Sequence, residues 1–347
     1  MTSPELGVNS LRWRDAMESA LYGPDGFFTR PGATGPGGHF RTSAHATATF
    51  ARALRPLLRR VDEALGNPDP FQLVDVGAGR GELLLRIARR YRADFQGRLR
   101  PLAVELAARP DDLPPGIGWT DRIPDRITGL LLATEWLDNV PVDVVEAGSS
   151  GPRYVLTDGS LGEPVSTADA EWLARWYPPL PPGARAEVGL PRDLAWSAAL
   201  RRVERGVAVA VDYGHLRDGR PLDGTLTGYR EGRQVPPRAD GSTDVTAHVA
   251  MDSVAEAGAE SLARTRPGGD PYRLMIQREA LQALGADGRR PPLSLAASDP
   301  AGYVRALARA SEVAELLDPA GLGGHWWLIQ AVGVAHPFSV GDGIVES

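Results

Sequence analysis

Short apolar segments alternate with segments of helical periodicity through the middle of the chain. Residues 71–76, 100–105, 130–134 and 207–211 are compact apolar runs, and residues 81–91 repeat apolar side chains at helical spacing. Strands that are separated by helices pair in parallel through right-handed crossovers. The pattern therefore predicts an α/β fold with a doubly wound, mostly parallel, Rossmann-like sheet.

A helical region precedes this alternation. Residues 9–22 and 44–65 have the apolar spacing of helices, and a loop rich in glycine and proline lies between them at residues 30–43. The sequence Gly66-Asn67-Pro68-Asp69-Pro70 ends the second helix. We therefore expect residues 1–66 to form an N-terminal helical extension.

A long stretch interrupts the alternation after residue 134. It contains the run Pro178-Pro179-Leu180-Pro181-Pro182 and is too long for a simple connection, so we expect residues 140–205 to form an inserted subdomain. The core domain would then comprise residues 67–139 and 206–347. Its last part has the pattern of helices near 252–264 and 277–284 and of a final strand at 325–334.

The turn after the first strand is rich in glycine and reads Asp75-Val76-Gly77-Ala78-Gly79-Arg80-Gly81. Glycine lets the backbone turn sharply and approach a ligand, because it has no Cβ. The alternative is a tight strand–helix turn without a ligand, since a short glycine pattern is weak by itself. The candidate cofactor-binding residues of this turn are Asp75, Gly77, Gly79 and Gly81.

Glu82 discriminates between two kinds of cofactor for this turn. The dinucleotide fingerprint Gly-x-Gly-x-x-Gly requires glycine at this position, and a carboxylate there repels a pyrophosphate. S-Adenosylmethionine (SAM) has no phosphate and carries a sulfonium cation, so nearby carboxylates are compatible with it. Glu105, at the end of the second strand, is placed to accept hydrogen bonds from a ribose. We favour SAM, and a nicotinamide-dependent oxidoreductase remains an alternative.

Two acidic residues follow the strand at 130–134. Glu135 and Asp138 are three residues apart, and we expect them to face the same side of one turn at the mouth of the site. Glu135 is a candidate for both cofactor binding and catalysis, and Asp138 for catalysis. Ordinary helix capping before Pro141 is the alternative.

Three more polar residues follow strand ends. Asp121 comes after a short third strand and is a candidate contact for adenine. Asp212 and Tyr213 end the strand at 207–211 and are expected to face the cleft as substrate contacts. A strand-ending turn is the alternative for this pair.

Composition excludes several kinds of chemistry. The 347 residues include no cysteine and no lysine, so all 38 basic residues are arginine. A Schiff base with pyridoxal phosphate, a Walker-type phosphate site, a thiol nucleophile and a cysteine-ligated iron–sulfur cluster are therefore excluded. The net charge of −6 disfavours nucleic acid as a partner, and the six histidines have no metal-ligand spacing. Without a membrane-length apolar run or a signal sequence, we expect a cytoplasmic protein with no metal and no membrane contact.

Five segments occur in an order that is typical of one family. They are Asp75 to Gly81, Thr134 to Val142, Asp212 to Gly214, Gly224 to Arg230 and Asp244 to Val249. Together they resemble the MidA-like SAM-dependent methyltransferases, the family of a mitochondrial complex I assembly factor that acts as a protein arginine methyltransferase. The resemblance implies a class I methyltransferase with SAM as its cofactor. The methyl acceptor would be a nitrogen or oxygen of a protein side chain or of a small molecule, and a homodimer is a further expectation.

Methyl transfer from a sulfonium requires an acceptor lone pair aligned with the methyl group and the sulfur. For an arginine acceptor, Glu135 and Asp138 would orient the guanidinium. For another nitrogen or oxygen acceptor, a histidine base would suffice. A structural hydrogen bond is the default role of a single histidine, and only the resemblance implies a catalytic role for His248.

Two histidines depart from the family pattern near the N-terminus. The family has acidic residues at the positions of His39 and His45. These two residues are candidate substrate contacts, and the loss of two negative charges there would disfavour a guanidinium. A non-catalytic SAM-binding assembly factor is therefore kept as the alternative function.

Overall fold

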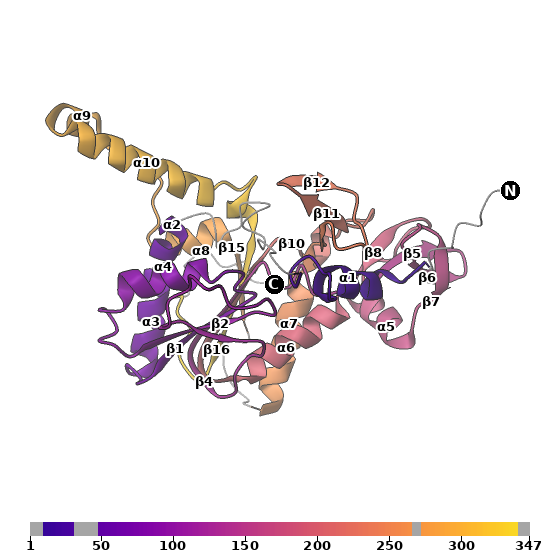
Figure 1. Cartoon of the computed structure of the whole chain (residues 1–347). Helices are drawn as coiled ribbons and strands as arrows, with labels where there is room; N and C mark the ends of the chain where they lie inside the picture. Colours follow the sequence, from indigo (N-terminus) through magenta and orange to yellow (C-terminus); the bar gives the residue numbers. More distant parts are fainter. Residues whose placement is uncertain (1–9, 31–47, 266–271, 339–347) are drawn as a thin grey trace.

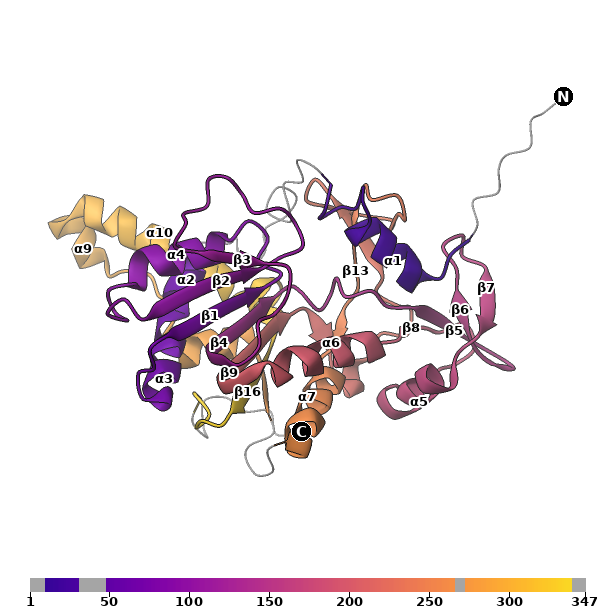
Figure 2. The ribbon, with the colours of Figure 1, turned by 60° about the horizontal axis from the view of Figure 1, so that its bottom comes forward.

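The computed structural model describes residues 10–30, 48–265 and 272–338. A seven-stranded sheet in the order β15-β16-β9-β4-β1-β2-β3 forms its centre, with helices on both faces (Figure 1, Figure 2). Its strands are β1 (Phe71–Val76), β2 (Leu99–Val104), β3 (Gly118–Thr120), β4 (Ile127–Thr134), β9 (Val203–Asp212), β15 (Arg273–Ile276) and β16 (Trp326–Val332). The five strands from β9 to β3 pair in parallel, which confirms the predicted α/β fold with its mostly parallel sheet.

The last two strands of this sheet are antiparallel to their neighbours. Strand β16 pairs with β9 so that Trp326 lies opposite Asp212. The beginning of β16 is therefore at the edge where the parallel strands end. Strand β15 pairs with β16 and was not predicted, because four residues beginning with Arg273 carry too short a pattern.

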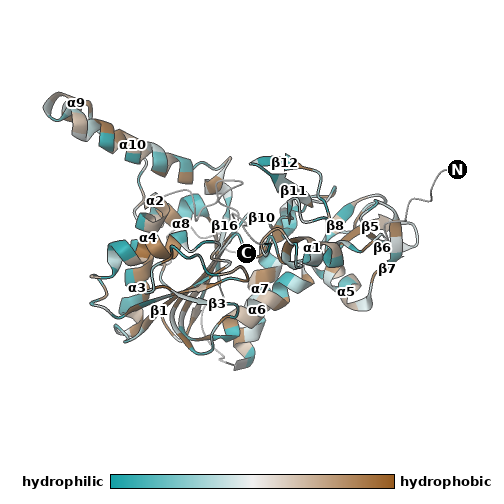
Figure 3. Cartoon of the chain, in the orientation of Figure 1, coloured by the Kyte–Doolittle hydropathy of each residue, from teal (hydrophilic) through white to brown (hydrophobic). Residues whose placement is uncertain are grey.

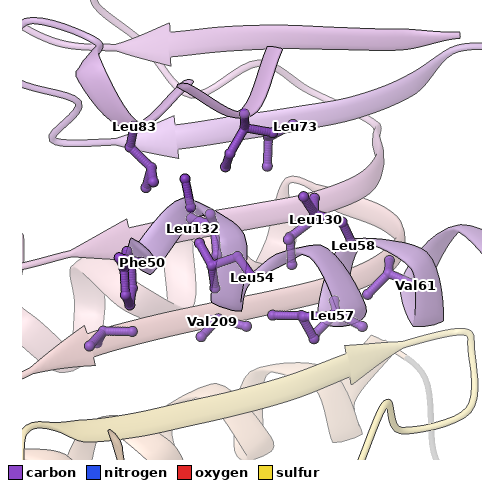
Figure 4. Close-up of a cluster of buried hydrophobic side chains, with 14 of the residues drawn as sticks. Phe50, Leu54, Leu57, Leu58, Val61, Leu73, Leu83, Leu130, Leu132 and Val209 are labelled. Atoms are coloured by element: carbon purple, nitrogen blue, oxygen red, sulfur yellow. The ribbon is translucent and has the colours of Figure 1, made fainter. Parts of the chain in front are cut away.

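Two hydrophobic cores hold the helices against the faces of the sheet. One face packs against α2 (Ala48–Ala53), α3 (Arg55–Leu65), α4 (Glu82–Tyr91) and α8 (Gln277–Ala283), and the other against α6 (Leu190–Arg201) and α7 (Met251–Thr265). Figure 4 shows Phe50 and Leu57 of the first group with Leu130 and Val209 of the strands. Each such leucine contributes about 1.5–3 kcal/mol by leaving water.

The alternation of side chains along the strands supplies both cores. In β1, Leu73 belongs to the first core and Val74 to the second, since successive residues of a strand point to opposite faces. The flanking helices carry hydrophobic and hydrophilic residues in alternation along their length (Figure 3). Burial on both faces therefore explains why the strands are nearly continuous apolar runs.

Gly129 and Gly206 lie side by side in the two central strands β4 and β9. Their φ angles are 147° and 141°. A Cβ on Gly129 would lie 2.0 Å from the main-chain oxygen of Gln72, and a Cβ on Gly206 would lie 1.9 Å from the oxygen of Gly129. The strands can approach here only because both positions lack a side chain.

Smaller sheets form a second region beside the central sheet (Figure 2). Two of them are antiparallel, with the orders β7-β6-β5-β8 and β12-β11-β13, and β10 pairs in parallel with β14. Helix α5 (Thr167–Trp176) connects β7 to β8. The strands are β5 (Val144–Gly148), β6 (Gly151–Val155), β7 (Leu161–Pro164), β8 (Arg185–Glu187), β10 (Gly214–His215), β11 (Thr227–Arg230), β12 (Arg233–Val235), β13 (Asp244–Thr246) and β14 (Val249–Ala250).

Helix α1 (Trp13–Tyr22) joins these sheets through a hydrophobic core of its own. Met17 packs there with Val144 of β5 and Val245 of β13. The bounds expected for the N-terminal extension (1–66), the inserted subdomain (140–205) and the core domain (67–139 and 206–347) stay a prediction. Helix α6, which falls within residues 140–205, packs with α7 against the central sheet.

A helical arm extends from the body of the protein (Figure 1). It consists of α9 (Leu293–Ser298) and α10 (Pro300–Leu316), neither of which was predicted. Asp299 caps α10 by accepting a hydrogen bond from the amide of Gly302. Two short 3₁₀ helices, Arg217–Gly219 and Leu322–Gly324, complete the elements of the described ranges. Within those ranges, no helix has the length and apolar character to cross a membrane.

Asp193 gives the stability of this fold a pH dependence. Burial on α6 raises its pKa to about 7, although Ser253 and Trp172 donate hydrogen bonds to its Oδ2. The unfolded chain loses this proton near pH 4, so the folded state binds more protons between about pH 4 and 7. The free energy of unfolding therefore falls as the pH rises through this range.

We expect Asp193→Asn to remove this loss, because a neutral amide keeps an oxygen for both donors. Urea unfolding should show the variant more stable than the wild type by roughly 2–4 kcal/mol at pH 8 and nearly equal to it at pH 4. An equal difference at both pH values would contradict the assignment of a raised pKa to this carboxyl group.

Candidate functional site

A cavity of about 700 Å³ opens at the carboxyl ends of β1, β2 and β4. This is the edge at which open α/β sheets bind ligands. The opposite wall comes from α1 and the turn that follows it. The lining residues are Glu18, Tyr22, Phe28, Thr29, Arg30, Val76, Gly77, Gly79, Arg80, Val104, Glu105, Leu106, Ala107, Ala108, Pro110, Asp121, Ile123, Glu135, Trp136, Asn139, Val140 and Pro141.

The glycines of the turn after β1 have three different surroundings. All three have positive φ angles, of 71° at Gly77, 57° at Gly79 and 77° at Gly81. A Cβ on Gly77 would come within 3.2 Å of Trp136, and one on Gly81 within 3.2 Å of Leu113. A Cβ on Gly79 would meet no atom within 4 Å. Gly79 therefore exposes its main chain to the cavity. Gly81 lies outside the lining, and its missing side chain lets Leu113 pack against the turn.

Glu105 holds this turn in place from the end of β2. Its Oε2 accepts a hydrogen bond of 2.9 Å from the amide of Gly79, and its Oε1 accepts from the amides of Leu106 and Ala107 at 2.8 and 3.2 Å. Burial raises the pKa of Glu105, and these three amides oppose that rise. Its carboxylate also lines the cavity, where it can accept a hydrogen bond from a ribose hydroxyl.

Asp75 lies beneath the turn and does not line the cavity. It is 1% exposed, and its Oδ1 accepts no hydrogen bond from a described residue. Burial raises its pKa to about 7, and the negative charges of Glu105 and Glu82 add to the rise. Asp75 would therefore affect a bound molecule indirectly, through the glycine turn that lies above it. Asp121, in contrast, lines the cavity after β3 as expected.

Glu135 follows β4 in a left-handed conformation, with φ at 50°. Such a backbone costs energy in a residue other than glycine and often marks a functional position. The side chain is 7% exposed and lines the cavity. Its Oε1 lies 3.9 Å from Nδ1 of His325. Glu135 thus connects the cavity with the beginning of β16.

The expectation that Asp138 shares the cavity with Glu135 is wrong. Asp138 is 2% exposed and its Oδ2 accepts hydrogen bonds from the hydroxyl groups of Tyr213 and Thr246. The i, i+3 argument fails because the left-handed Glu135 turns the chain, so no helical turn joins the two carboxylates. Burial raises the pKa of Asp138.

Buried ionisable groups behind the cavity wall fix the loop after β4. Oδ2 of Asp212 accepts hydrogen bonds from the amides of Leu137 and Asp138 at 3.0 and 3.3 Å. The guanidinium of Arg192 donates to the main-chain oxygens of Asp138 at 2.6 Å and His248 at 2.7 Å. Asp212 is 1% exposed and therefore does not face the cleft, contrary to expectation. It supports the loop that carries Glu135.

Three of the four histidines in the described ranges lie near Tyr213 or near one another, and Tyr213 also lies outside the cavity lining. The Tyr213 ring is 5.3 Å from the ring of His248 and 5.6 Å from that of His325, and His215 is 6.4 Å from His248. Burial lowers the pKa of all three imidazoles, to about 4 for His325 and about 3 for His215. They are therefore uncharged at neutral pH. We call these four residues the imidazole cluster.

His248 is the exposed member of the imidazole cluster, and its amide donates to Oγ1 of Thr225 at 2.9 Å. His325 was not singled out from the sequence, because only the antiparallel pairing of β16 brings it to this edge. His39 and His45 lie outside the described residues. Among the described residues, no group of histidine and carboxylate side chains could hold a metal ion.

The sequence patterns also did not indicate that α1 forms a wall of the cavity. Glu18, Tyr22 and Arg30 precede the glycine turn by about fifty residues, and nothing in their spacing indicates a shared site. Figure 1 shows α1 close to the carboxyl edge of the sheet. The hydroxyl of Tyr22 donates a 3.1 Å hydrogen bond to the main-chain oxygen of Asn139, which joins the two walls directly.

Comparisons with known proteins identify the family. Residues 57–268 match a family model described as "Putative S-adenosyl-L-methionine-dependent methyltransferase". The chain is also 26% identical over 289 residues to the "Protein arginine methyltransferase NDUFAF7 homolog, mitochondrial" of Drosophila melanogaster. That match covers 70% of this chain and 65% of the Drosophila protein, so it spans less than two thirds of the relative.

Two crystal structures of one superfamily from Burkholderia thailandensis have the same fold. One contains S-adenosyl-homocysteine and is 23% identical, with a TM-score of 0.72 over 94% of this chain and 90% of that chain. The other, described as uncharacterized, is 22% identical, with a TM-score of 0.74 over 94% and 89%. The predicted cofactor fits the cavity, which offers an open glycine at Gly79 and a ribose acceptor at Glu105, and none of the described residues places a buried cation at the turn. The chain belongs to this family of S-adenosyl-L-methionine-dependent methyltransferases.

Proposed function

We propose that this methyltransferase transfers the methyl group of SAM to a guanidinium nitrogen of an arginine side chain in a protein. The observation that carries the proposal is the position of Glu135, a carboxylate that lines the cofactor cavity and also adjoins the imidazole cluster. The printed name of the Drosophila relative supports the same acceptor. The cytoplasmic location and the homodimer stay predictions.

The imidazole cluster suits a cationic acceptor. Its three histidines are neutral at neutral pH and do not repel a guanidinium. His248 and His325 offer nitrogen atoms as hydrogen-bond acceptors, whereas Nδ1 of His215 already contacts Nη1 of Arg220 at 2.6 Å. The Tyr213 ring adds an aromatic surface of the kind that attracts cations. Two buried cations lie nearby. Arg192 donates to main-chain oxygens and supports the loop, and Arg220 is paired with Asp252, which offsets its charge.

The proposed step needs one bond to form and one to break. A nitrogen lone pair of the acceptor attacks the methyl carbon, and the electron pair of the broken carbon–sulfur bond stays on sulfur. Since the arginine guanidinium is protonated before the reaction, one of its protons must leave. Glu135 is placed to hold the guanidinium during the attack and to accept that proton afterwards.

The test uses methyl-labelled SAM, the purified full-length chain and a protein extract, followed by acid hydrolysis and separation of the amino acids. We expect label in methylarginine. Replacing Glu135 with glutamine should lower the labelling rate by about 100-fold, and should change the Kd for S-adenosylhomocysteine by less than about threefold. Glu146→Gln is the matched control, at a partly buried ion pair between Glu146 of β5 and Arg185 of β8 outside the cavity, and should retain the wild-type rate.

Label that appears only in small molecules would replace arginine by a small-molecule acceptor. An unchanged rate in Glu135→Gln would remove this residue from the acceptor site. Loss of S-adenosylhomocysteine binding in the same variant would make its role one of cofactor binding only.

A further inference from the structure

The described residues that line the cavity carry more negative than positive side chains, and the amides of the glycine turn do not offset this excess. Among the described residues, four carboxylates line it, from Glu18, Glu105, Asp121 and Glu135, against the two guanidinium groups of Arg30 and Arg80. The sulfonium and ammonium groups of SAM suit this surplus of negative charge. The carboxylate of its amino-acid tail does not, because like charges repel strongly in a partly dehydrated cavity.

Most main-chain amides of the turn already have acceptors within the protein. Gly77 and Ala78 donate to the oxygen of Val104, at 3.0 and 3.3 Å. Gly79 donates to Glu105 and Gly81 donates to the oxygen of Ala78, at 2.9 and 2.8 Å. Four of the five amides from residue 77 to residue 81 therefore have acceptors within the protein. A side chain must supply most of the donors for an anionic group.

Arg30 is the better placed of the two arginines. Arg80 is exposed at the rim and pairs with Asp112 at 3.3 Å. Arg30 is half-buried on the α1 wall, and no carboxylate of the described ranges pairs with it. Its Nη1 donates to the main-chain oxygen of Gly241 at 3.3 Å, which fixes one end of the guanidinium and leaves the other donors for a ligand.

The turn that carries Arg30 is rigidly built. The amides of Thr29 and Arg30 both donate to the oxygen of Gly26, at 3.2 and 3.0 Å, and the hydroxyl of Thr29 donates to the oxygen of Gly23. Gly241, which holds the guanidinium, has a φ of 74°. A Cβ there would lie 2.6 Å from the oxygen of Asp25, so this backbone is pressed against the same turn. Arg30 is therefore positioned before any ligand arrives.

We propose that Arg30 binds the α-carboxylate of the amino-acid tail of SAM and of S-adenosylhomocysteine. Guanidinium and carboxylate match in charge and geometry, and such pairs are among the strongest hydrogen-bonded contacts. Glu18 lies on the same wall and suits the neighbouring ammonium group. The N-terminal segment thus recognises the amino-acid part of the cofactor, while the sheet edge holds the nucleoside. This inference does not depend on the identity of the methyl acceptor.

Calorimetry on the full chain with two probes tests the proposal. S-Adenosylhomocysteine contains the amino-acid tail, and 5′-methylthioadenosine shares its adenosine and sulfur but lacks the tail. Arg30→Gln should raise the Kd for S-adenosylhomocysteine by about tenfold or more and change the Kd for 5′-methylthioadenosine by less than about twofold. Arg80→Gln tests the other arginine of the lining and should show no loss specific to the tail. Arg59→Gln, at an exposed ion pair with Glu63 outside the cavity, is the matched control and should change both constants by less than about twofold.

Arg30→Lys keeps the charge without the planar fork and should give an intermediate Kd for S-adenosylhomocysteine. If Arg30→Gln does not fold, Arg30→Lys replaces it in the same measurement. Thermal unfolding of each variant shows whether it is folded. An equal loss for both probes, an unchanged Kd for S-adenosylhomocysteine, or a tail-specific loss in Arg80→Gln would each overturn the proposal. Binding of neither probe to the wild type would instead reject the cavity as the cofactor site.

Discussion

Replacing Gly79 with leucine is expected to abolish cofactor binding, with the Kd for S-adenosylhomocysteine rising by about 100-fold or more. The missing Cβ of Gly79 would project into open space within the cavity, with no protein atom within 4 Å. A leucine side chain there would occupy the volume that the cofactor needs. Labelling of any acceptor from methyl-labelled SAM would stop for the same reason.

The backbone of Gly79 adds a second effect that a control must separate. Its φ of 57° is costly for a branched side chain, by roughly 1–2 kcal/mol. Gly97 has a φ of 82° and also has no atom within 4 Å of its missing Cβ, but it lies in the loop before β2, away from the cavity. Gly97→Leu should therefore lose a similar amount of stability and keep full affinity. Tight binding by Gly79→Leu would contradict the site.

The second large effect is expected from alanine at Gly129. The new Cβ would lie 2.0 Å from the oxygen of Gln72, well inside any permitted contact, and the φ of 147° is unfavourable for alanine. To remove this steric clash, β1 and β4 would have to separate in the middle of the sheet, where both strands are buried. We expect a loss of at least about 4 kcal/mol, out of a total stability of about 5–15 kcal/mol.

Urea unfolding of the purified variant measures this loss, and a chain that is recovered only in insoluble form would agree with it. Gly159→Ala is the matched control, since Gly159 has a φ of 84° in the turn before β7 and open space around its missing Cβ. It should lose about 1 kcal/mol. If Gly129→Ala were as stable as Gly159→Ala, the close approach of β1 and β4 would be wrong.

The parts of the fold that could be predicted are those with a strong local pattern. Residues 71–76 are apolar because both faces of β1 are covered, and their predicted bounds are those of the structure. The glycine turn could be recognised because its backbone requires positive φ angles. Strand β15 and helix α10 were missed, since the first has four residues and the second mixes alanine with arginine in a weak pattern.

The site could be predicted only where it follows a strand directly. Glu105, Asp121 and Glu135 all line the cavity, because the carboxyl ends of parallel strands meet at one edge. Spacing could not show that Asp138 turns inward, since that depends on the left-handed Glu135. Residues brought in by tertiary packing, such as His325 and Arg30, leave no signal in a single sequence.

The hydrogen bond between Tyr22 and Asn139 joins a helix near the start of the chain to the loop after the fourth strand. A ligand in the cavity contacts both sides of this bridge and so acts as a second tie between them. By mass action, a cofactor present at a hundred times its Kd would add about 2.7 kcal/mol to the folded state. Resistance to heat and to proteolysis should therefore report how much cofactor the cell supplies.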